Sequence, residues 1–305
     1  MIIAKRLLAL IPVAAGVVTI VSLLIHMVPG NPADVVLGPY ATEAEKTAYL
    51  STMGLDHPIP VQIWNYFHHL LRGDLGISMI YQKPVTELIA SRMLPTLELA
   101  LCGMIVAVCL SLPLGILGAV FRGTWIDYTS MTFALVGVAI PNFWLGPLLI
   151  MVFSLTWGLL PVSERTGALS YIMPSISLGL ALAAMLSRMT RNSMLDTMKE
   201  DYVRTARSKG ASSWSVICKH VLRNAALPLV TIVGLQFGVL LTGAIITERV
   251  FDWPGLGSLI LEGINNRDYP VVQGCVLTFS ATYLVVNLLT DVVYSVVDPR
   301  IRHEK

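Results

Sequence analysis

Long apolar runs separated by shorter polar stretches form the main pattern along this chain. Six of these runs have about the 20 residues that an α-helix needs to cross a bilayer. They lie at about 7–28, 96–121, 128–157, 172–189, 227–247 and 271–297. The pattern therefore predicts an all-α polytopic membrane protein with six transmembrane helices.

The polar segment 29–94, between the first two runs, is predicted to contain two short helices. Thr42 and Glu45 have the spacing of a capping box, which starts a helix at Thr42. A second helix begins near Pro60 and stops at Gly73. We expect this segment to be extracytoplasmic because its acidic residues outnumber its basic ones. The predicted organisation is a first span with a cytosolic N-terminus at 1–28, the extracytoplasmic segment at 29–94, a five-helix core at 95–297 and a cytosolic tail at 298–305.

A polar island at residues 191–224 separates the fourth and fifth runs. Roughly a third of the basic residues lie in it or one turn before it, so the positive-inside rule places this loop in the cytosol. Acidic residues at the front, basic residues behind and Gly210 predict a short helix that ends at the glycine. Lys5 and Arg6 precede the first run, which lacks a small-residue cleavage site. We therefore expect a signal-anchor and two cytosolic termini.

Smaller features refine these elements. Pro113 and Pro141 predict kinks within the second and third spans. Glu98 is expected in the first turn of the second span, where the helix dipole favours a negative charge. Residues 248–270 are expected to form an outer loop.

Polar residues inside the spans are candidates for a translocation path. Gln236 lies in the fifth span, and Asn287 and Asp291 lie four residues apart in the sixth. Gly234 and Gly238 have the spacing that lets two helices approach closely. We expect Gln236 to face protein or a water-filled path. For Asn287 and Asp291, we favour the alternative of an interhelical hydrogen bond or a helix cap near the cytosolic surface.

Composition excludes several other classes of function. Hydrophobic residues make up 55% of the chain, charged residues 13%, and the mean hydropathy is +0.70, as expected for a chain surrounded by membrane lipid. The basic residues cluster beside the spans, so no nucleic-acid partner is expected. The sequence contains no phosphate-binding loop and no metal-ligand spacing, and its four cysteines do not suggest disulfides. We therefore expect no enzymatic activity, cofactor or metal in this chain.

Several motifs carry a resemblance to a known family. Residues 200–210 read Glu-Asp-Tyr-Val-Arg-Thr-Ala-Arg-Ser-Lys-Gly, and Pro228 follows. This stretch resembles the EAA loop of ABC-transporter permeases, the coupling helix that sits in a groove of the ATP-binding subunit. Arg204 and Thr205 stand where the general motif has Glu and Ala. Residues 73–78, 140–146, 251–257 and 267–270 resemble further signatures of the dipeptide, oligopeptide and nickel branch.

The resemblance implies a type I ABC importer permease in the bacterial cytoplasmic (inner) membrane. Its partners would be a second homologous permease subunit, forming a heterodimer, two ATPase subunits beneath loop 191–224, and an extracytoplasmic substrate-binding protein. The residues implied in ATPase coupling are Asp201, Tyr202, Arg204, Thr205, Ala206, Lys209 and Gly210. The implied solute is a short peptide, with nickel chelates and glutathione as alternatives.

Two other classes of function compete with this interpretation. A secondary transporter driven by an ion gradient through Asp291 would be expected to show inverted repeats and paired intramembrane charges, and the sequence shows neither. A membrane scaffold without transport does not explain the polar island.

Overall fold

The computed structural model describes residues 11–20, 22–23, 32–38, 40–163 and 165–297, and almost all of the regular structure in them is helical. The chain divides into two compact units. The first comprises residues 1–96 and 254–284, and the second comprises residues 97–253 and 285–305. Two long helices, α5 (Val85–Val120) and α13 (Tyr269–Val297), each begin in the first unit and end in the second.

The first unit contains short helices on either side of a turn-rich stretch. These are α2 (Pro32–Leu37), α3 (Glu43–Thr52), α4 (Ile59–Leu70) and α12 (Leu256–Asn265). The predicted capping box is confirmed, because Glu45 N–H donates to Thr42 Oγ1 and Thr42 N–H donates to Glu45 Oε2. The predicted stop at Gly73 is confirmed too, with a φ of +76° just beyond the end of α4.

Asp268 ties residues 76–80 to the turn before α13. Its carboxylate is buried and accepts hydrogen bonds from Ser78 Oγ at 2.5 Å and from Ile80 N–H at 3.2 Å. Gly76 has a φ of +87°, which L side chains rarely adopt, and it packs next to Pro270, whose Cβ would lie 3.4 Å from a Cβ at this position. Segments far apart in the sequence are thus fixed together within the first unit.

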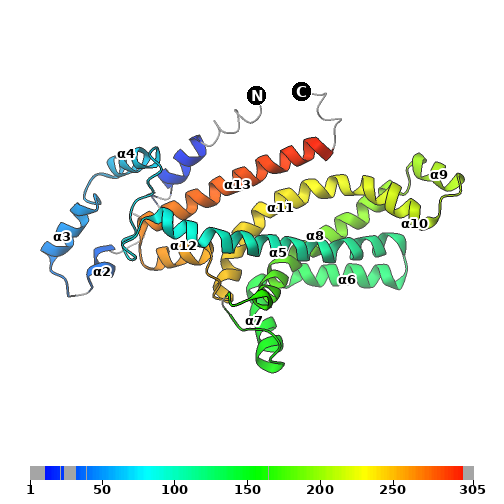
Figure 1. Ribbon diagram of the computed structural model, residues 1–305, viewed down its shortest axis with the longest axis horizontal. Coiled ribbons are helices and arrows are strands. Elements are labelled where there is room, and N and C mark those ends of the chain that lie inside the picture. Colours follow the sequence, from blue (N-terminus) through cyan, green and yellow to red (C-terminus); the bar gives the residue numbers. More distant parts are fainter. Residues whose placement is uncertain (1–10, 21, 24–31, 39, 164, 298–305) are drawn as a thin grey trace. The chain divides into compact units, whose positions relative to one another are not determined.

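The second unit is a bundle of helices (Figure 1). Its elements are the rest of α5, α6 (Trp125–Ala139), α7 (Asn142–Leu149), π-helical η1 (Ile150–Thr156), 3₁₀-helical η2 (Ala168–Tyr171), α8 (Ile172–Thr197), α9 (Asp201–Ser208), α10 (Ser213–Ser215), π-helical η3 (Val216–Leu222), α11 (Arg223–Val250) and the end of α13. Helix α8 packs against α6, α7 and α11. A Cβ at Gly179 would overlap the backbone of Gly103, so α8 also approaches α5 backbone to backbone.

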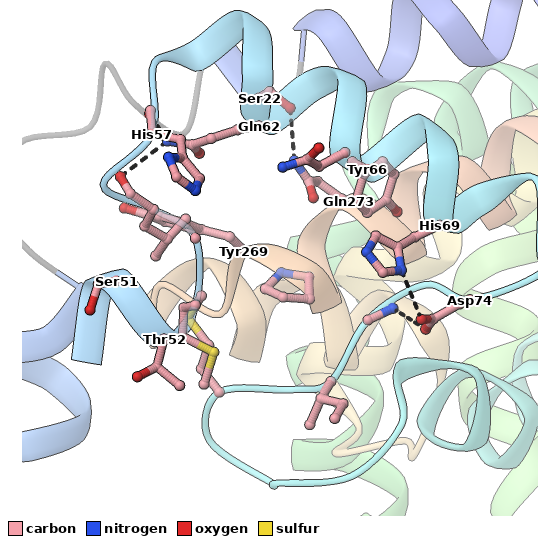
Figure 2. A pocket seen from close by; sticks show the side chains of 18 residues that line it. Ser22, Ser51, Thr52, His57, Gln62, Tyr66, His69, Asp74, Tyr269 and Gln273 are labelled. Atoms are coloured by element: carbon pink, nitrogen blue, oxygen red, sulfur yellow. Dashed lines mark hydrogen bonds and ion pairs between the residues drawn. The ribbon is translucent and has the colours of Figure 1, made fainter. Parts of the chain in front are cut away.

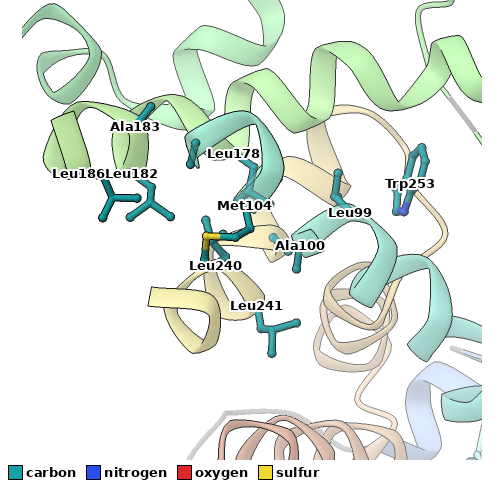
Figure 3. Packing of buried hydrophobic residues seen from close by; sticks show 12 residues of the cluster. Leu99, Ala100, Met104, Leu178, Leu182, Ala183, Leu186, Leu240, Leu241 and Trp253 are labelled. Carbon is teal, nitrogen blue, oxygen red and sulfur yellow. The ribbon is translucent and has the colours of Figure 1, made fainter. Parts of the chain in front are cut away.

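The core of the second unit lies where α5, α8 and α11 meet (Figure 3). Its fully buried members include Leu99, Leu178 and Leu186. The indole of Trp253 contacts Tyr171 edge to face, with ring centroids 4.7 Å apart. Segment 248–270, predicted as an outer loop, contains buried Trp253 and the helix α12, and its position outside the membrane stays a prediction.

Three further boundaries differ from the predictions. Helix α5 begins at Val85, so Glu98 lies well inside it rather than in its first turn. Helix α8 continues to Thr197, so residues 191–197 of the polar island are its last turns. The third span turns by 101° at Pro141, which is a break between α6 and α7 and not a kink. Hydropathy marks where a chain enters lipid, whereas these helices continue beyond the apolar residues or bend within them.

Three described helices, at 85–120, 168–197 and 269–290, are long and apolar enough to cross a membrane. The number rises to five if each of two bent pairs, 125–156 and 213–242, forms one span. Residues 11–20 form a shorter apolar helix, and the rest of the predicted first span falls mostly outside the described residues.

Candidate functional site

Helix α9 and the turn after it form the first candidate site. Asp201 lies in the first turn and Arg207 in the last turn, which suits the helix dipole. Gly210 has a φ of +80° and donates to Arg207 O at 3.0 Å, and Ala211 N–H donates to Ala206 O at 3.2 Å. These two bonds form a Schellman motif, in which glycine takes the left-handed position without strain. The predicted short helix with its glycine stop is therefore confirmed.

One face of α9 is buried in a small apolar cluster, here called the anchor cluster. Val203 is fully buried and Ala206 is 9% exposed. The anchor cluster joins α9 to the ends of α5 and α8, to η3 and to the start of α11, and its buried members are Ala119, Met194, Val203, Ala206, Val216, Val221 and Ala225. Asn224 Nδ2 adds a hydrogen bond to Tyr202 Oη at 3.0 Å. Helix α9 is therefore held against the bundle and does not project from it.

The other face of α9 carries polar and charged residues. Of the residues implied by the resemblance, Ala206 lies on the buried face and anchors the helix. The remaining six are exposed: Asp201, Tyr202, Arg204, Thr205, Lys209 and Gly210. Arg204 and Asp201 are 3.8 Å apart on this face, an exposed pair worth little to stability. The exposed face is available to a partner, and the anchor cluster gives it a fixed orientation.

A buried ion pair lies at the base of this region. Arg191 of α8 donates from Nε and Nη2 to the two carboxylate oxygens of Asp127 in α6, at 2.6 and 2.7 Å. The side chains are only 20% and 6% exposed. Gly123 N–H also donates to Asp127 at 3.0 Å, and a Cβ at Gly118 would be 3.2 Å from Arg191 Cδ. Helices α5, α6 and α8 therefore meet at the residue where the polar island begins.

The candidate path residues fall into separate groups. Gln236 Nε2 lies 3.4 Å from Met185 Sδ, on the side of α11 that faces α8. Gly234 instead faces α13, because a Cβ there would overlap the side chain of Thr290. Gly238 is buried one turn further along, and its carbonyl accepts a hydrogen bond from Thr242 Oγ1. The structure therefore does not bring Gln236 and the glycine pair to one surface.

Asn287 has a polar atom that lacks a partner. Its Oδ1 is buried and makes no hydrogen bond to any residue the structure describes. Asp291 lies in α13, but its side chain is outside the described part of the chain. Of the predicted pair Asn287 and Asp291, the structure therefore describes the side chain of Asn287 alone.

Sequence reasoning missed three polar contacts and one charge. The contacts are Asp127 with Arg191, and Glu98 with both Arg165 and Tyr171. The charge is Arg188, an exposed cation inside the apolar part of α8. A charged residue within an apolar run is a visible signal, and Asp127 and Arg188 both carry it.

The first unit contains a hollow of about 480 Å³ (Figure 2). On its wall, His69 Nδ1 lies 3.2 Å from Asp74 Oδ2, and Gln273 Nε2 donates to Ser22 Oγ at 2.8 Å. Burial raises the pKa of the Tyr66 phenol above its ordinary value, so this hydroxyl stays protonated. Among the described residues, no group of three or more His, Cys, Asp or Glu is placed so that it could hold a metal ion.

Family models match most of the chain. Residues 111–303 match the family described as "Binding-protein-dependent transport system inner membrane component", and residues 1–100 match its N-terminal companion. The chain is 47% identical over 300 residues to the glutathione transport system permease protein GsiC of Salmonella typhimurium (strain LT2), covering 98% of both chains. Its identity to the GsiC protein of Escherichia coli (strain K12) is 46% with the same coverage.

Solved structures share the fold at lower identity. A chain of the MetNI methionine ABC transporter, in an inward-facing conformation, matches with a TM-score of 0.59 and 18% identity, covering 70% of this chain and 97% of that one. A chain of an amino acid ABC transporter matches with a TM-score of 0.52 and 17% identity, covering 70% and 94%. The predicted all-helical fold of the type I importer permease is therefore confirmed.

Proposed function

The chain belongs to the family of binding-protein-dependent transport system inner membrane components, and we propose that it forms part of the path by which an ABC importer takes up short peptides, with glutathione as the favoured solute. As a family member it is a multi-pass permease subunit of the inner membrane, and it works with ATPase subunits and a substrate-binding protein. The identity of the solute and the arrangement of the partner subunits are part of this proposal.

The observation that supports glutathione is the similarity across the full length of the chain. Both permeases compared above are named as glutathione transport system permease proteins, and they align over 98% of this chain. Glutathione is itself a tripeptide, so it falls within the solute class that the sequence motifs favour. A different short peptide is the second candidate, and a nickel chelate is the third.

Helix α9 supports the proposed coupling to ATPase subunits. A docking helix must present polar groups outward and transmit force inward, and α9 has an exposed charged face and a face buried in the anchor cluster. We propose that two ATPase subunits contact loop 191–224 of this chain and of a second, homologous permease subunit. Nucleotide would then favour one of two gate positions through its different contacts with α9 in the two states.

The test of this function is uptake by a reconstituted complex. The chain, its partner permease, the ATPase pair and the binding protein are placed in liposomes, and labelled glutathione is supplied outside. We expect ATP-dependent accumulation that unlabelled glutathione suppresses more strongly than alanine tripeptide or nickel chelates. Preferential suppression by alanine tripeptide would assign the transporter to other peptides, and no accumulation of any of them would refute the proposed function.

Gly210→Asp is expected to abolish coupling to the ATPase while the chain still inserts in the membrane. Aspartate would have to adopt a φ of +80°, and it adds a negative charge to the proposed docking surface. Co-purification of the ATPase and uptake measure the effect. Gly210→Ala is the matched control, because it introduces the backbone strain, about 1 kcal/mol, without the charge. Normal assembly and uptake by Gly210→Asp would contradict docking at this turn.

The proposed topology places Ser51 outside the cell and Ser208 in the cytosol, and both residues are exposed in the structure. In a cysteine-free background, Ser51→Cys should react with an impermeant thiol reagent added to intact cells. Ser208→Cys should react only after the membrane is made permeable. Equal reactivity of both positions in intact cells would contradict cytosolic termini and an external segment 29–94.

A further inference from the structure

One stripe of α8 stays exposed although the rest of the helix is enclosed. Between Leu182 and Met194, the residues on the other sides of the helix are buried or half-buried. The exposed positions are Met185, Arg188 and Asn192, here called the exposed stripe. They are three and four residues apart, so they lie on one face of the helix.

Two of the three residues in the exposed stripe are polar: Arg188 lies at the end of the apolar run 172–189, and Asn192 lies in the polar island. Arg188 makes no hydrogen bond or ion pair with any described residue. Asn192 lies one turn beyond it, and both are exposed. Gln236 reaches the same face from α11, where its amide Nε2 has only Met185 Sδ, a weak acceptor, at 3.4 Å.

Arg191 is a useful comparison, because its guanidinium group is paired with a carboxylate. Arg191, one turn along α8, is held by both oxygens of Asp127, whereas Arg188 has no such carboxylate. An unpaired cation in a membrane span is costly, so it faces water, an anion or the headgroup layer. Arg188 lies only about 4.5 Å along the axis from Arg191, and from there its long side chain could reach lipid phosphates as well as a path between subunits.

We propose that the exposed stripe lines the water-filled translocation path and that Arg188 binds a carboxylate of the passing solute. A guanidinium group forms two parallel hydrogen bonds to a carboxylate, and the amides of Asn192 and Gln236 can donate or accept hydrogen bonds beside it. This inference rests on the proposed function, because it supplies the solute. A lipid phosphate offers the same anionic chemistry, and the experiment separates the two sources.

The first measurement asks whether the exposed stripe meets water. In the assembled complex in liposomes, with Cys102, Cys109, Cys218 and Cys275 replaced by alanine, Asn192→Cys is compared with Phe133→Cys. Phe133 is an apolar side chain on α6 that is 52% exposed, which makes it the control for a lipid-facing site. Asn192→Cys should react with water-soluble methanethiosulfonates, and Phe133→Cys only with a lipid-soluble maleimide.

Reaction of Asn192→Cys with the maleimide alone would assign the stripe to lipid, and reaction with neither reagent would assign it to a protein interface. Both outcomes would overturn the proposal.

The second measurement asks whether Arg188 attracts anions. Asn192→Cys is treated with anionic sulfonatoethyl and cationic trimethylammonium-ethyl methanethiosulfonate, and the ratio of the two rates is recorded. Adding Arg188→Gln should lower the ratio of anionic to cationic rates about fivefold or more, because one positive charge near the thiol is lost. Adding Arg188→Lys should largely preserve it. An unchanged ratio in Arg188→Gln would overturn the role of Arg188.

The third measurement links the site to the solute. Arg188→Gln should reduce glutathione uptake about tenfold at a subsaturating concentration, and Arg188→Lys should retain most of the uptake. Phe133→Leu is the control and should transport normally. If the unaltered complex takes up no glutathione, the proposed function fails and the two labelling results still decide whether the stripe faces water. If it takes up glutathione and Arg188→Gln does so equally well, the inference alone fails.

Discussion

Asp127→Ala is expected to destabilise the chain by about 3 kcal/mol and to release the end of α8 from α6. The substitution leaves Arg191 with its guanidinium mostly buried and without a carboxylate, and breaking a buried ion pair from one side is strongly destabilising. We place the effect at the low end of the usual range because Arg191 retains some exposure. The midpoint of thermal unfolding of the purified chain in detergent measures it.

A double-mutant cycle separates the pair from the surrounding packing. Asp127→Ala combined with Arg191→Met removes both charges, so much of the lost stability should return. The control is Asp196→Ala, which breaks the exposed contact to Lys199 at 3.0 Å and should change stability little. A double variant no more stable than Asp127→Ala would contradict the view that the unpaired arginine causes the loss.

Gly234→Leu is expected to abolish uptake, because the structure leaves no room for a side chain between α11 and α13. Even a Cβ at this position would overlap Thr290, so a leucine must push the two helices apart. Overpacking of this kind costs about 1–3 kcal/mol and occasionally more. Uptake and retention of the chain in the membrane are measured in parallel.

The matched test adds a single methyl group at Gly234 and shortens Thr290 opposite it. Gly234→Ala should be impaired, and Thr290→Ala should partly restore it, because the substitution removes two of the three atoms that the new Cβ would meet. Leu235→Phe is the control, since Leu235 is 46% exposed on the adjacent side of the same helix. If Gly234→Leu transports normally, α13 does not pack against α11 as the structure describes.

The sequence predicted elements whose signals are local. The capping box at Thr42 and the glycine stops at Gly73 and Gly210 depend on residues within one turn of each other, and all three were confirmed. The apolar runs likewise predicted the helices of the bundle. The first run remains a prediction as a full span, because its two ends, 7–10 and 24–28, lie outside the described residues.

Features that depend on distant residues could not be predicted in this way. Asp127 and Arg191 are far apart in the chain, and hydropathy alone does not report which helices become neighbours. The same limit explains why Gln236 and Gly234 were grouped together although they face α8 and α13 respectively. For Glu98, the sequence predicted a helix start about ten residues too late, so this residue was assigned to the helix dipole. Its contacts with Arg165 and Tyr171 were therefore not predicted.

The enclosure of α8 has a consequence for how the chain is made. The best apolar window of span 168–197 is 61% buried within the protein and has a mean hydropathy of 1.8, whereas that of 85–120 is 39% buried and reaches 2.4. Of these two spans, the one more buried within the protein is the less hydrophobic, so on its own it gains less from entering a bilayer. We expect α8 to leave the translocon late, after α5 and α6 have been released to receive it. A ribosome-stalled chain ending just after residue 197 should therefore insert α8 efficiently only when α5 and α6 precede it.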